Sequence, residues 1–336
     1  MESKHLPSVF QDKHRFEASF KIYAVKIDML GVYSKWVDRV FDEAVVRVIQ
    51  AKLDGKEELR VLGVGSGAGE PDYMMLEKVM KRFPRIINRV VEPTTVFLDQ
   101  YRALAQSKAH KLQGVMCDWR QQTIEQYEKA GDLTKFHFIS AVQSLYYVDN
   151  PESTLMYMYE RLEPGGVMLV AIISEDSGWM RFWNHFPSLH DQLFAGVDSA
   201  ILKSWLDRRG IPYTRYNQPT HCDITVCFDQ SSEEGSLLLD SLTQVLNFRK
   251  TVPEDLQTSV MNYLANGKKD GGRVFIEACW EVIVVSKPRQ PFGLLEPPTA
   301  TWPVLWSHKG GPKVADLCKR GSKDAQHSDA ADFVCG

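Results

Sequence analysis

The sequence predicts an α/β protein with a doubly wound, mostly parallel sheet, an N-terminal helical cap and a small substrate-binding addition. Three observations lead to this fold class. Strand and helix candidates alternate between residues 59 and 174, a glycine-rich turn follows the first of these strands, and helical spacing of apolar residues precedes it. Such alternation is typical of a parallel sheet with helices on both faces.

The N-terminal segment carries apolar side chains at helical spacing. This spacing predicts two or three helices within residues 11–52, ahead of the first strand. We expect residues 1–52 to form a helical cap over the active site. The spaced residues are Phe16, Phe20, Tyr23, Ile27, Leu30, Trp36, Val40 and Val45.

The first strand candidate leads into a turn with four glycines, in the sequence LRVLGVGSGAGE at residues 59–70. Glycine lacks a Cβ atom, so it adopts positive φ angles and lets the backbone approach a ligand closely. The next helix starts near Glu70 and directs its N-terminal amides to the same place. We therefore expect a ligand that contains adenosine. The glycines are Gly63, Gly65, Gly67 and Gly69.

The glycine turn alone leaves two ligands open. Residues 63–68 match the G-x-G-x-x-A dinucleotide pattern, and residues 65–69 match the tighter G-x-G-x-G loop that binds S-adenosylmethionine. Glu92, in the strand candidate at 89–93, is placed to accept hydrogen bonds from a ribose in either case.

Further strands and helices follow in alternation up to Ser174. A proline begins the helix that precedes the last strand of this series, and Gly165-Gly166 closes it. That last strand is apolar throughout, as expected for a fully buried parallel strand. The expected helices are 71–83, 95–107, about 122–130 and 151–164, and the expected strands are 112–118, 136–143 and 167–174.

After Ser174 the pattern changes. Residues 177–187 are rich in tryptophan and predict a loop or short helix, with helices following to about residue 210, and residues 232–265 are expected to be helical. Strands at 223–228 and 274–286 are expected to finish the same sheet in antiparallel fashion.

The expected organisation has four segments. A cofactor-binding core at 53–175 follows the cap, and a substrate-binding addition with the end of the sheet occupies 176–287. Residues 288–336 are rich in proline, glycine and charge, which predicts a disordered tail.

Composition favours small-molecule chemistry. The 336 residues are 44% hydrophobic and 25% charged, with a net charge of −3, so no basic surface for nucleic acid or an anionic membrane is expected. No secretion signal or apolar membrane span of about 20 residues is present, which predicts a cytoplasmic protein. The six cysteines match no common metal pattern, so we expect reduced thiols and no bound metal. We also expect the protein to be a monomer.

Several motifs together resemble the histamine N-methyltransferase family over roughly residues 9–287. They are GVGSGAGE, VVEPT, AVQSLYYVDNPESTL, LEPGG and SGWxxFW. The resemblance implies a class I, Rossmann-like methyltransferase that uses S-adenosylmethionine to methylate the imidazole ring of a small molecule. A nicotinamide-dependent reductase is then the weaker alternative. The resemblance assigns cofactor binding to Gly65, Gly67, Gly69, Glu92, Phe97, Gln122 (or its neighbour Gln121) and Val142.

The resemblance also implies a substrate pocket with aromatic walls. Gln143 would bind one ring nitrogen and so fix which nitrogen faces the methyl group, while Tyr146 and Tyr147 flank the ring; these three are the expected catalytic residues. Without the resemblance, the aromatic residues would be interpreted as core side chains. The expected substrate-binding residues are Phe16, Phe20, Asp28, Gln143, Tyr147, Trp179, Trp183 and Phe248.

Three positions depart from the family. Phe16 stands where the family usually has a tyrosine, Met29 where it has the acid that meets the substrate ammonium, and Ala278 where it has a late asparagine. Asp28 is adjacent to Met29 and takes the acid's role if the helix shifts. These losses favour the dipeptide carnosine, giving anserine, over histamine; an inactive cofactor-binding homologue is the third hypothesis. Candidate partners for the carnosine carboxylate are Lys26 and Arg181.

Overall fold

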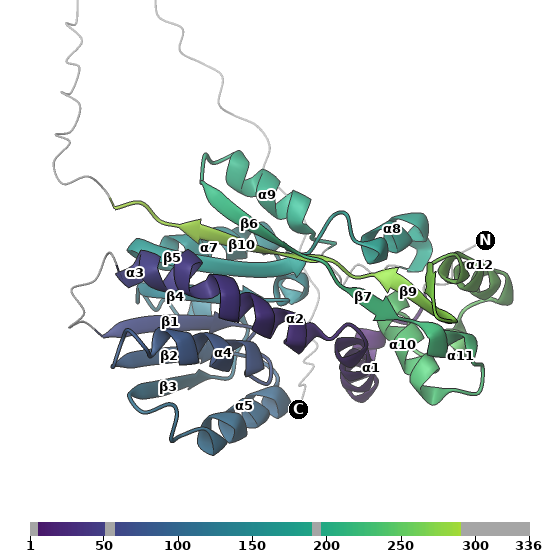
Figure 1. Ribbon diagram of the computed structural model, residues 1–336, viewed down its shortest axis with the longest axis horizontal. Helices are drawn as coiled ribbons and strands as arrows, with labels where there is room; N and C mark the ends of the chain where they lie inside the picture. Colours follow the sequence, from purple (N-terminus) through teal and green to yellow (C-terminus); the bar gives the residue numbers. More distant parts are fainter. Residues whose placement is uncertain (1–5, 51–57, 190–195, 290–336) are drawn as a thin grey trace, which may run out of the picture. The chain divides into compact units, whose positions relative to one another are not determined.

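A seven-stranded sheet with the order β3-β2-β1-β4-β5-β10-β6 forms the centre of the computed structural model, which describes residues 6–50, 58–189 and 196–289 (Figure 1). Only β10 runs antiparallel to its neighbours β5 and β6. The predicted mostly parallel sheet is therefore confirmed. The strands are β1 (Leu59–Val64), β2 (Ile86–Val91), β3 (Val115–Arg120), β4 (Phe136–Val142), β5 (Leu162–Ile173), β6 (Tyr213–Gln218) and β10 (Trp280–Ser286).

Helices cover both faces of this sheet, because successive side chains of β5 pack alternately into two apolar clusters. Leu169 packs in one apolar cluster with the N-terminal helices and α4 (Glu70–Val79). Its neighbours Met168 and Val170 belong to a second cluster on the other face, with α6, α7 and α9. These helices are α6 (Ile124–Lys129), α7 (Pro151–Arg161) and α9 (Ser199–Asp207), while α5 (Thr95–Ser107) packs on Val90 of β2.

The N-terminal segment is helical, as predicted, but its helices take two positions. Trp36, Phe41 and Val45 pack on the sheet in the same cluster as Leu169. Only α1 (Lys13–Lys26) and the short turn before it, η1 (Val9–Gln11), lie beside the later helices (Figure 1). The segments on the sheet are α2 (Met29–Trp36), the π-helical η2 (Val37–Val46) and α3 (Arg47–Gln50).

The strand predicted at 223–228 is wrong. A strand ends at Asp223, whose carboxylate accepts the N–H and hydroxyl groups of Thr225, and this local turn leads into η5 (Thr225–Phe228). The strand belongs to a separate three-stranded sheet with the order β7-β9-β8. Its members are β7 (His221–Asp223), β8 (Lys268–Asp270) and β9 (Arg273–Glu277).

The single strand predicted at 274–286 is two strands in two sheets. β9 ends at Glu277, and β10 begins at Trp280 in the main sheet. Between them, Ala278 donates its N–H to the Thr220 carbonyl at 2.9 Å, and the Cys279 carbonyl accepts the N–H of Ser174 at 3.0 Å. These contacts turn the chain from one sheet to the other.

The helix predicted at 232–265 is present as three helices. Left-handed residues at Gln244 (φ 59°) and Asn247 (φ 51°) end the first helix and begin the second, and Pro253 precedes the third. They are α10 (Glu233–Thr243), α11 (Phe248–Thr251) and α12 (Glu254–Ala265). The tryptophan-rich segment forms α8 (Gly178–His185), followed by η4 (Pro187–Leu189).

Two further properties concern the described residues only. Cys117, Cys222, Cys227 and Cys279 are free thiols. No described helix has the length and apolarity needed to cross a membrane, and no described group of His, Cys, Asp or Glu is arranged to hold a metal ion. The tail predicted from residue 288 falls almost wholly outside the described residues and stays a prediction.

Candidate active site

The glycine turn after β1 depends on its missing side chains. Gly65 has φ +62°, and a Cβ built there would lie 2.5 Å from the Cβ of Ser144. Gly69 has φ +88°, and its Cβ would meet the ring of Tyr101 at 2.1 Å, whereas a Cβ on Gly67 meets nothing within 4 Å. The loop is thus held tightly at both ends and is open beside Gly67.

Glu92 holds this loop from the end of β2. Its buried carboxylate accepts the N–H of Gly67 at 2.9 Å and the N–H of Thr94 at 2.8 Å. Each carboxylate oxygen retains a second lone pair, so Glu92 still has acceptors for ribose hydroxyl groups. The residue therefore both shapes the loop and fits the ligand role predicted for it.

The other predicted cofactor residues lie along the same edge of the sheet. Val142 is the last residue of β4, Gln122 follows β3, and Phe97 is half-buried in the first turn of α5. Gln121, the alternative to Gln122, is occupied by a hydrogen bond from its side-chain amide to the Thr95 hydroxyl at 2.7 Å. In open α/β sheets, ligands bind outside the carboxyl ends of the parallel strands, which is where these residues stand.

A buried carboxyl group, Asp72, lies beneath the glycine turn. Its Oδ2 atom would be 2.4 Å from a Cβ on Gly63, so this position also excludes a side chain. Burial raises the pKa of Asp72 to about 6, although the Ser140 hydroxyl donates to its Oδ1 atom at 3.5 Å and favours the ionised form.

A cavity opens between α1, α8, α10 and the end of β4, with an empty volume of about 670 Å³ that includes its open mouth. It brings together seven of the predicted pocket residues from three separate parts of the chain. These are Phe16, Phe20, Gln143, Tyr146, Tyr147, Trp179 and Trp183.

Two predicted substrate residues lie outside the cavity lining. Asp28 is exposed with φ +47°, and its carboxylate folds back over its own helix, 2.4 Å from a Cβ built on Gly31. Phe248 is fully buried behind the wall in α11. By contrast, the three positions that depart from the family, Phe16, Met29 and Ala278, do line the cavity.

Gln143 follows β4 with φ +53° and is fixed by its neighbour Tyr146 in η3 (Leu145–Tyr147). Tyr146 donates its hydroxyl hydrogen to Oε1 of Gln143 at 2.7 Å and accepts the N–H of Ile173 at 2.5 Å. Burial raises the pKa of Tyr146, so the phenol stays neutral and remains a donor. The amide plane of Gln143 is thereby set.

The two tryptophans share one acceptor. Both indole N–H groups donate to the carbonyl oxygen of Leu242 in α10, each at 2.8 Å. Their ring centroids are 4.8 Å apart, and Tyr23 packs on Trp179 at 4.5 Å. With their N–H groups occupied, the indoles offer aromatic surface to the cavity.

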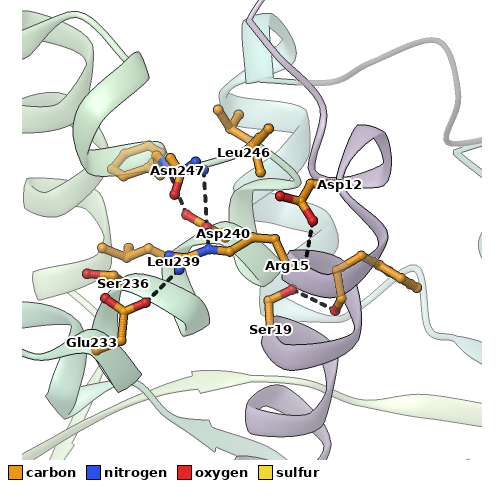
Figure 2. Close-up of polar contacts among 12 residues, drawn as sticks. Asp12, Arg15, Ser19, Glu233, Ser236, Leu239, Asp240, Leu246 and Asn247 are labelled. Carbon is orange, nitrogen blue, oxygen red and sulfur yellow. Dashed lines mark hydrogen bonds and ion pairs between the residues drawn. The ribbon is translucent and has the colours of Figure 1, made fainter.

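An ion pair holds α1 against α10, two helices that both contribute residues to the cavity lining (Figure 2). Arg15 Nε lies 2.6 Å from Asp240 Oδ2, and a second nitrogen of Arg15 lies 2.5 Å from Glu233. Asp240, only 1% exposed, also accepts the backbone N–H groups of Asn247 at 3.1 Å and Phe248 at 2.8 Å. Burial raises the pKa of Asp240 in spite of these partners.

Sequence reasoning missed several lining residues. Tyr23 and Ile27 follow Phe16 and Phe20 on one face of α1, so helical spacing carried a signal for them. For Ser241, in α10, and Gln244, directly after it, the sequence carried no signal that they line the cavity. The missed residues are Val9, Ser19, Tyr23, Ile27, Ile173, Ser241, Gln244, Cys279 and Trp280.

Comparison with known proteins shows which family the chain is similar to. Residues 33–215 match the family model described as a methyltransferase domain. Histamine N-methyltransferase of Danio rerio is 34% identical over 69% of this chain and 82% of its own length. The Mus musculus protein of that name is 32% identical over 80% of this chain and 94% of its own, and the Bos taurus protein is 31% identical over 83% and 97%.

The chain belongs to the histamine N-methyltransferase-like family of class I methyltransferases.

The cofactor of this methyltransferase is S-adenosylmethionine. The open side of Gly67 and the spare lone pairs of Glu92 fit the adenosine of that cofactor. The nicotinamide-dependent alternative is set aside. The individual cofactor and substrate contacts remain predictions, now restricted by the positions described above.

Proposed function

We propose that this methyltransferase methylates a ring nitrogen of an imidazole compound and that carnosine is its preferred substrate. The names of the relatives support imidazole as the acceptor. The preference for carnosine rests on one observation: the described residues that line the cavity include no charged side chain.

The charge of the substrate tail decides between the two compounds. Histamine ends in an ammonium group, and burying an ammonium group without a carboxylate is strongly unfavourable. The nearest predicted acid, Asp28, is folded over Gly31 outside the lining. Carnosine carries an ammonium and a carboxylate on a longer tail, so its net charge is zero and both groups can reach water at the cavity mouth.

Neither predicted partner of that carboxylate stands in the lining. Lys26 pairs with Glu234 at 2.9 Å, and Arg181 pairs with Glu277. Both cations are therefore occupied, which agrees with a carboxylate that stays solvated at the mouth.

The cofactor supplies a methyl group on a positively charged sulfur. The residues of the chain hold the imidazole, which has a reference pKa of about 6.5 and is mostly neutral near pH 7, with one nitrogen lone pair toward that methyl group. Oε1 of Gln143 has a second lone pair beyond the one used by Tyr146, and this can accept the N–H of the other ring nitrogen. No strong base is needed, because the attacking nitrogen carries no proton.

Methylation leaves the ring as a cation. Aromatic faces stabilise a cation by about 0.5–2 kcal/mol each, and the cavity has such faces at Tyr146, Tyr147, Trp179 and Trp183. This stabilisation grows as charge moves onto the ring, so it acts on the transition state more than on the neutral substrate.

The test is a competition assay. Purified protein with methyl-labelled S-adenosylmethionine receives carnosine and histamine at equal concentration, and mass spectrometry measures both methylated products. We expect carnosine to be methylated preferentially and Gln143→Leu to abolish most of the turnover. Preferential methylation of histamine would reject the substrate preference.

Histamine is the second candidate, because the relatives are named for it. A third outcome of the same assay, cofactor binding by calorimetry without product from either compound, would support the inactive cofactor-binding homologue.

A further inference from the structure

Gln244 has an unusual position at the end of α10. It is the C-terminal cap of the helix with φ 59° and ψ 17°, a left-handed conformation that is uncommon outside glycine, and it is only 8% exposed. Gln244 is one of the residues that line the cavity. No part of the mechanism proposed above uses it.

The amide orientation of Gln244 is fixed by its surroundings. Its side-chain nitrogen donates to the carbonyl oxygen of Ser241, which can only accept. The backbone carbonyl of Gln244 accepts the N–H of Val9 at 3.0 Å, so the N-terminal segment holds the residue from the other side. Consequently the amide oxygen, Oε1, is the atom left over.

Oε1 of Gln244 is buried and has no hydrogen-bond partner among the described residues. Buried amide oxygens are nearly always paired, because burial without a donor forfeits their hydrogen bond to water. An oxygen of this kind in the wall of a substrate cavity is complementary to an N–H group of the ligand.

Gln244 and Gln143 belong to different walls. Gln143 precedes Ser144, which contacts the glycine turn at Gly65, and so stands beside the cofactor loop. Gln244 stands where α10 meets the N-terminal segment. The ring that accepts the methyl group belongs near Gln143, which leaves Gln244 for the substrate tail.

We propose that Oε1 of Gln244 accepts a hydrogen bond from the peptide N–H in the tail of carnosine and is a specificity-determining residue of this enzyme. This inference rests on the proposed function, because it takes an imidazole dipeptide as the substrate. A neutral acceptor suits a peptide N–H, which is itself neutral, and a ring without a tail makes no use of it.

The first experiment changes the substrate and leaves the protein intact. Wild-type enzyme is assayed with carnosine and with its depsipeptide analogue, in which an ester oxygen replaces the peptide N–H. We expect KM to be about 10-fold higher for the analogue, with kcat little changed. Equal KM values would overturn the inference while leaving the proposed function intact, whereas no methylation of either compound would reject the proposed function itself.

The second experiment changes the protein. In Gln244→Met, which keeps the side-chain length, KM for carnosine should rise about 10-fold and the difference between carnosine and the depsipeptide should vanish. Turnover of 4-methylimidazole, which has the ring but no tail N–H, should change less than about twofold. Gln106→Met, at an exposed position of α5, is the matched control and should behave as wild type.

The outcomes of the second experiment separate the two roles. An equal loss with carnosine and 4-methylimidazole would show that Gln244 acts on the ring or only on the fold, and would overturn the inference. Should Gln244→Met fail to fold because Ser241 loses its donor, the depsipeptide comparison on the wild-type enzyme still decides the question.

Discussion

Tyr146 and Gln143 form a hydrogen bond of 2.7 Å in which the phenol is the donor and the amide oxygen the acceptor. The same phenol oxygen accepts the N–H of Ile173, the last residue of β5, so the bond is tied to the sheet. The amide that we expect to bind the imidazole is therefore oriented before any substrate arrives, which reduces the cost of ordering it on binding.

Removal of the Tyr146 hydroxyl should damage catalysis more than stability. In Tyr146→Phe, Gln143 loses its fixed orientation and the Ile173 N–H loses its acceptor. We expect kcat/KM for the imidazole substrate to fall about 10-fold or more, with a loss of about 1–2 kcal/mol in the free energy of unfolding. Steady-state kinetics and urea unfolding measure the two effects. An unchanged kcat/KM would show that catalysis does not depend on the orientation that the Tyr146 hydroxyl gives to the Gln143 amide.

The buried ion pair between Arg15 and Asp240 (Figure 2) should contribute more to the free energy of unfolding than the exposed pair between Lys26 and Glu234. Arg15→Met leaves a carboxylate that is 1% exposed without its cation, and we expect a loss of about 3 kcal/mol in the free energy of unfolding. Lys26→Met breaks a second pair between the same two helices, but Glu234 is 46% exposed, so a loss below about 1 kcal/mol is expected. Denaturant unfolding of both variants makes the comparison, and equal losses would contradict it.

Gly65 should tolerate alanine much less well than a glycine with the same backbone angle. Gly65 and Gly210 both have φ +62°, but a Cβ on Gly210 meets nothing within 4 Å, whereas on Gly65 it meets Ser144. Gly210→Ala therefore measures backbone strain alone, about 1 kcal/mol. We expect Gly65→Ala also to weaken S-adenosylhomocysteine binding at least 10-fold in calorimetry. If Gly65→Ala binds S-adenosylhomocysteine with wild-type affinity, close approach of the cofactor to the backbone at Gly65 is excluded.

His137 should make the fold sensitive to acid. It is buried in β4, where its Nδ1 accepts the N–H of Arg60 at 3.0 Å, and burial together with Arg60 lowers its pKa to about 4. The unfolded chain, with a histidine pKa of about 6.5, takes up the proton first, so stability falls as the pH drops from about 6.5 to 4.

The variant His137→Gln keeps an acceptor for Arg60 and cannot titrate. We expect it to lose less unfolding free energy than wild type when the pH is lowered from 7.5 to 5, as measured by urea unfolding. Parallel curves for the two proteins would assign the acid sensitivity to other groups.

Local signals predicted the parallel part of the fold well. The helix expected at 95–107 forms α5 with those bounds. Its apolar spacing and the residues at its ends are local features of the sequence, and they suffice to predict it. The glycine turn was also predictable, because glycine adopts positive φ readily and Gly65, Gly67 and Gly69 all have positive φ. These features need no knowledge of distant partners.

The antiparallel part depended on contacts that the sequence does not display. β6 is an edge strand with polar residues on its exposed side, so its pattern is weak. The break between β9 and β10 falls in a segment without glycine, proline or another turn residue, and it is imposed by contacts with Thr220 and Ser174, far away in the chain. The aromatic walls were accessible through the family resemblance, whereas Gln244 became visible only through its buried, unpaired oxygen.

The lining of the cavity begins at Val9 and ends at Trp280. Because ribosomes make the chain from its N-terminus, the wall that contains Ala278 and Trp280 is the last to be synthesised. A nascent chain that already contains the whole glycine turn still lacks part of the substrate site. The cavity is therefore complete only after β10 has joined the sheet.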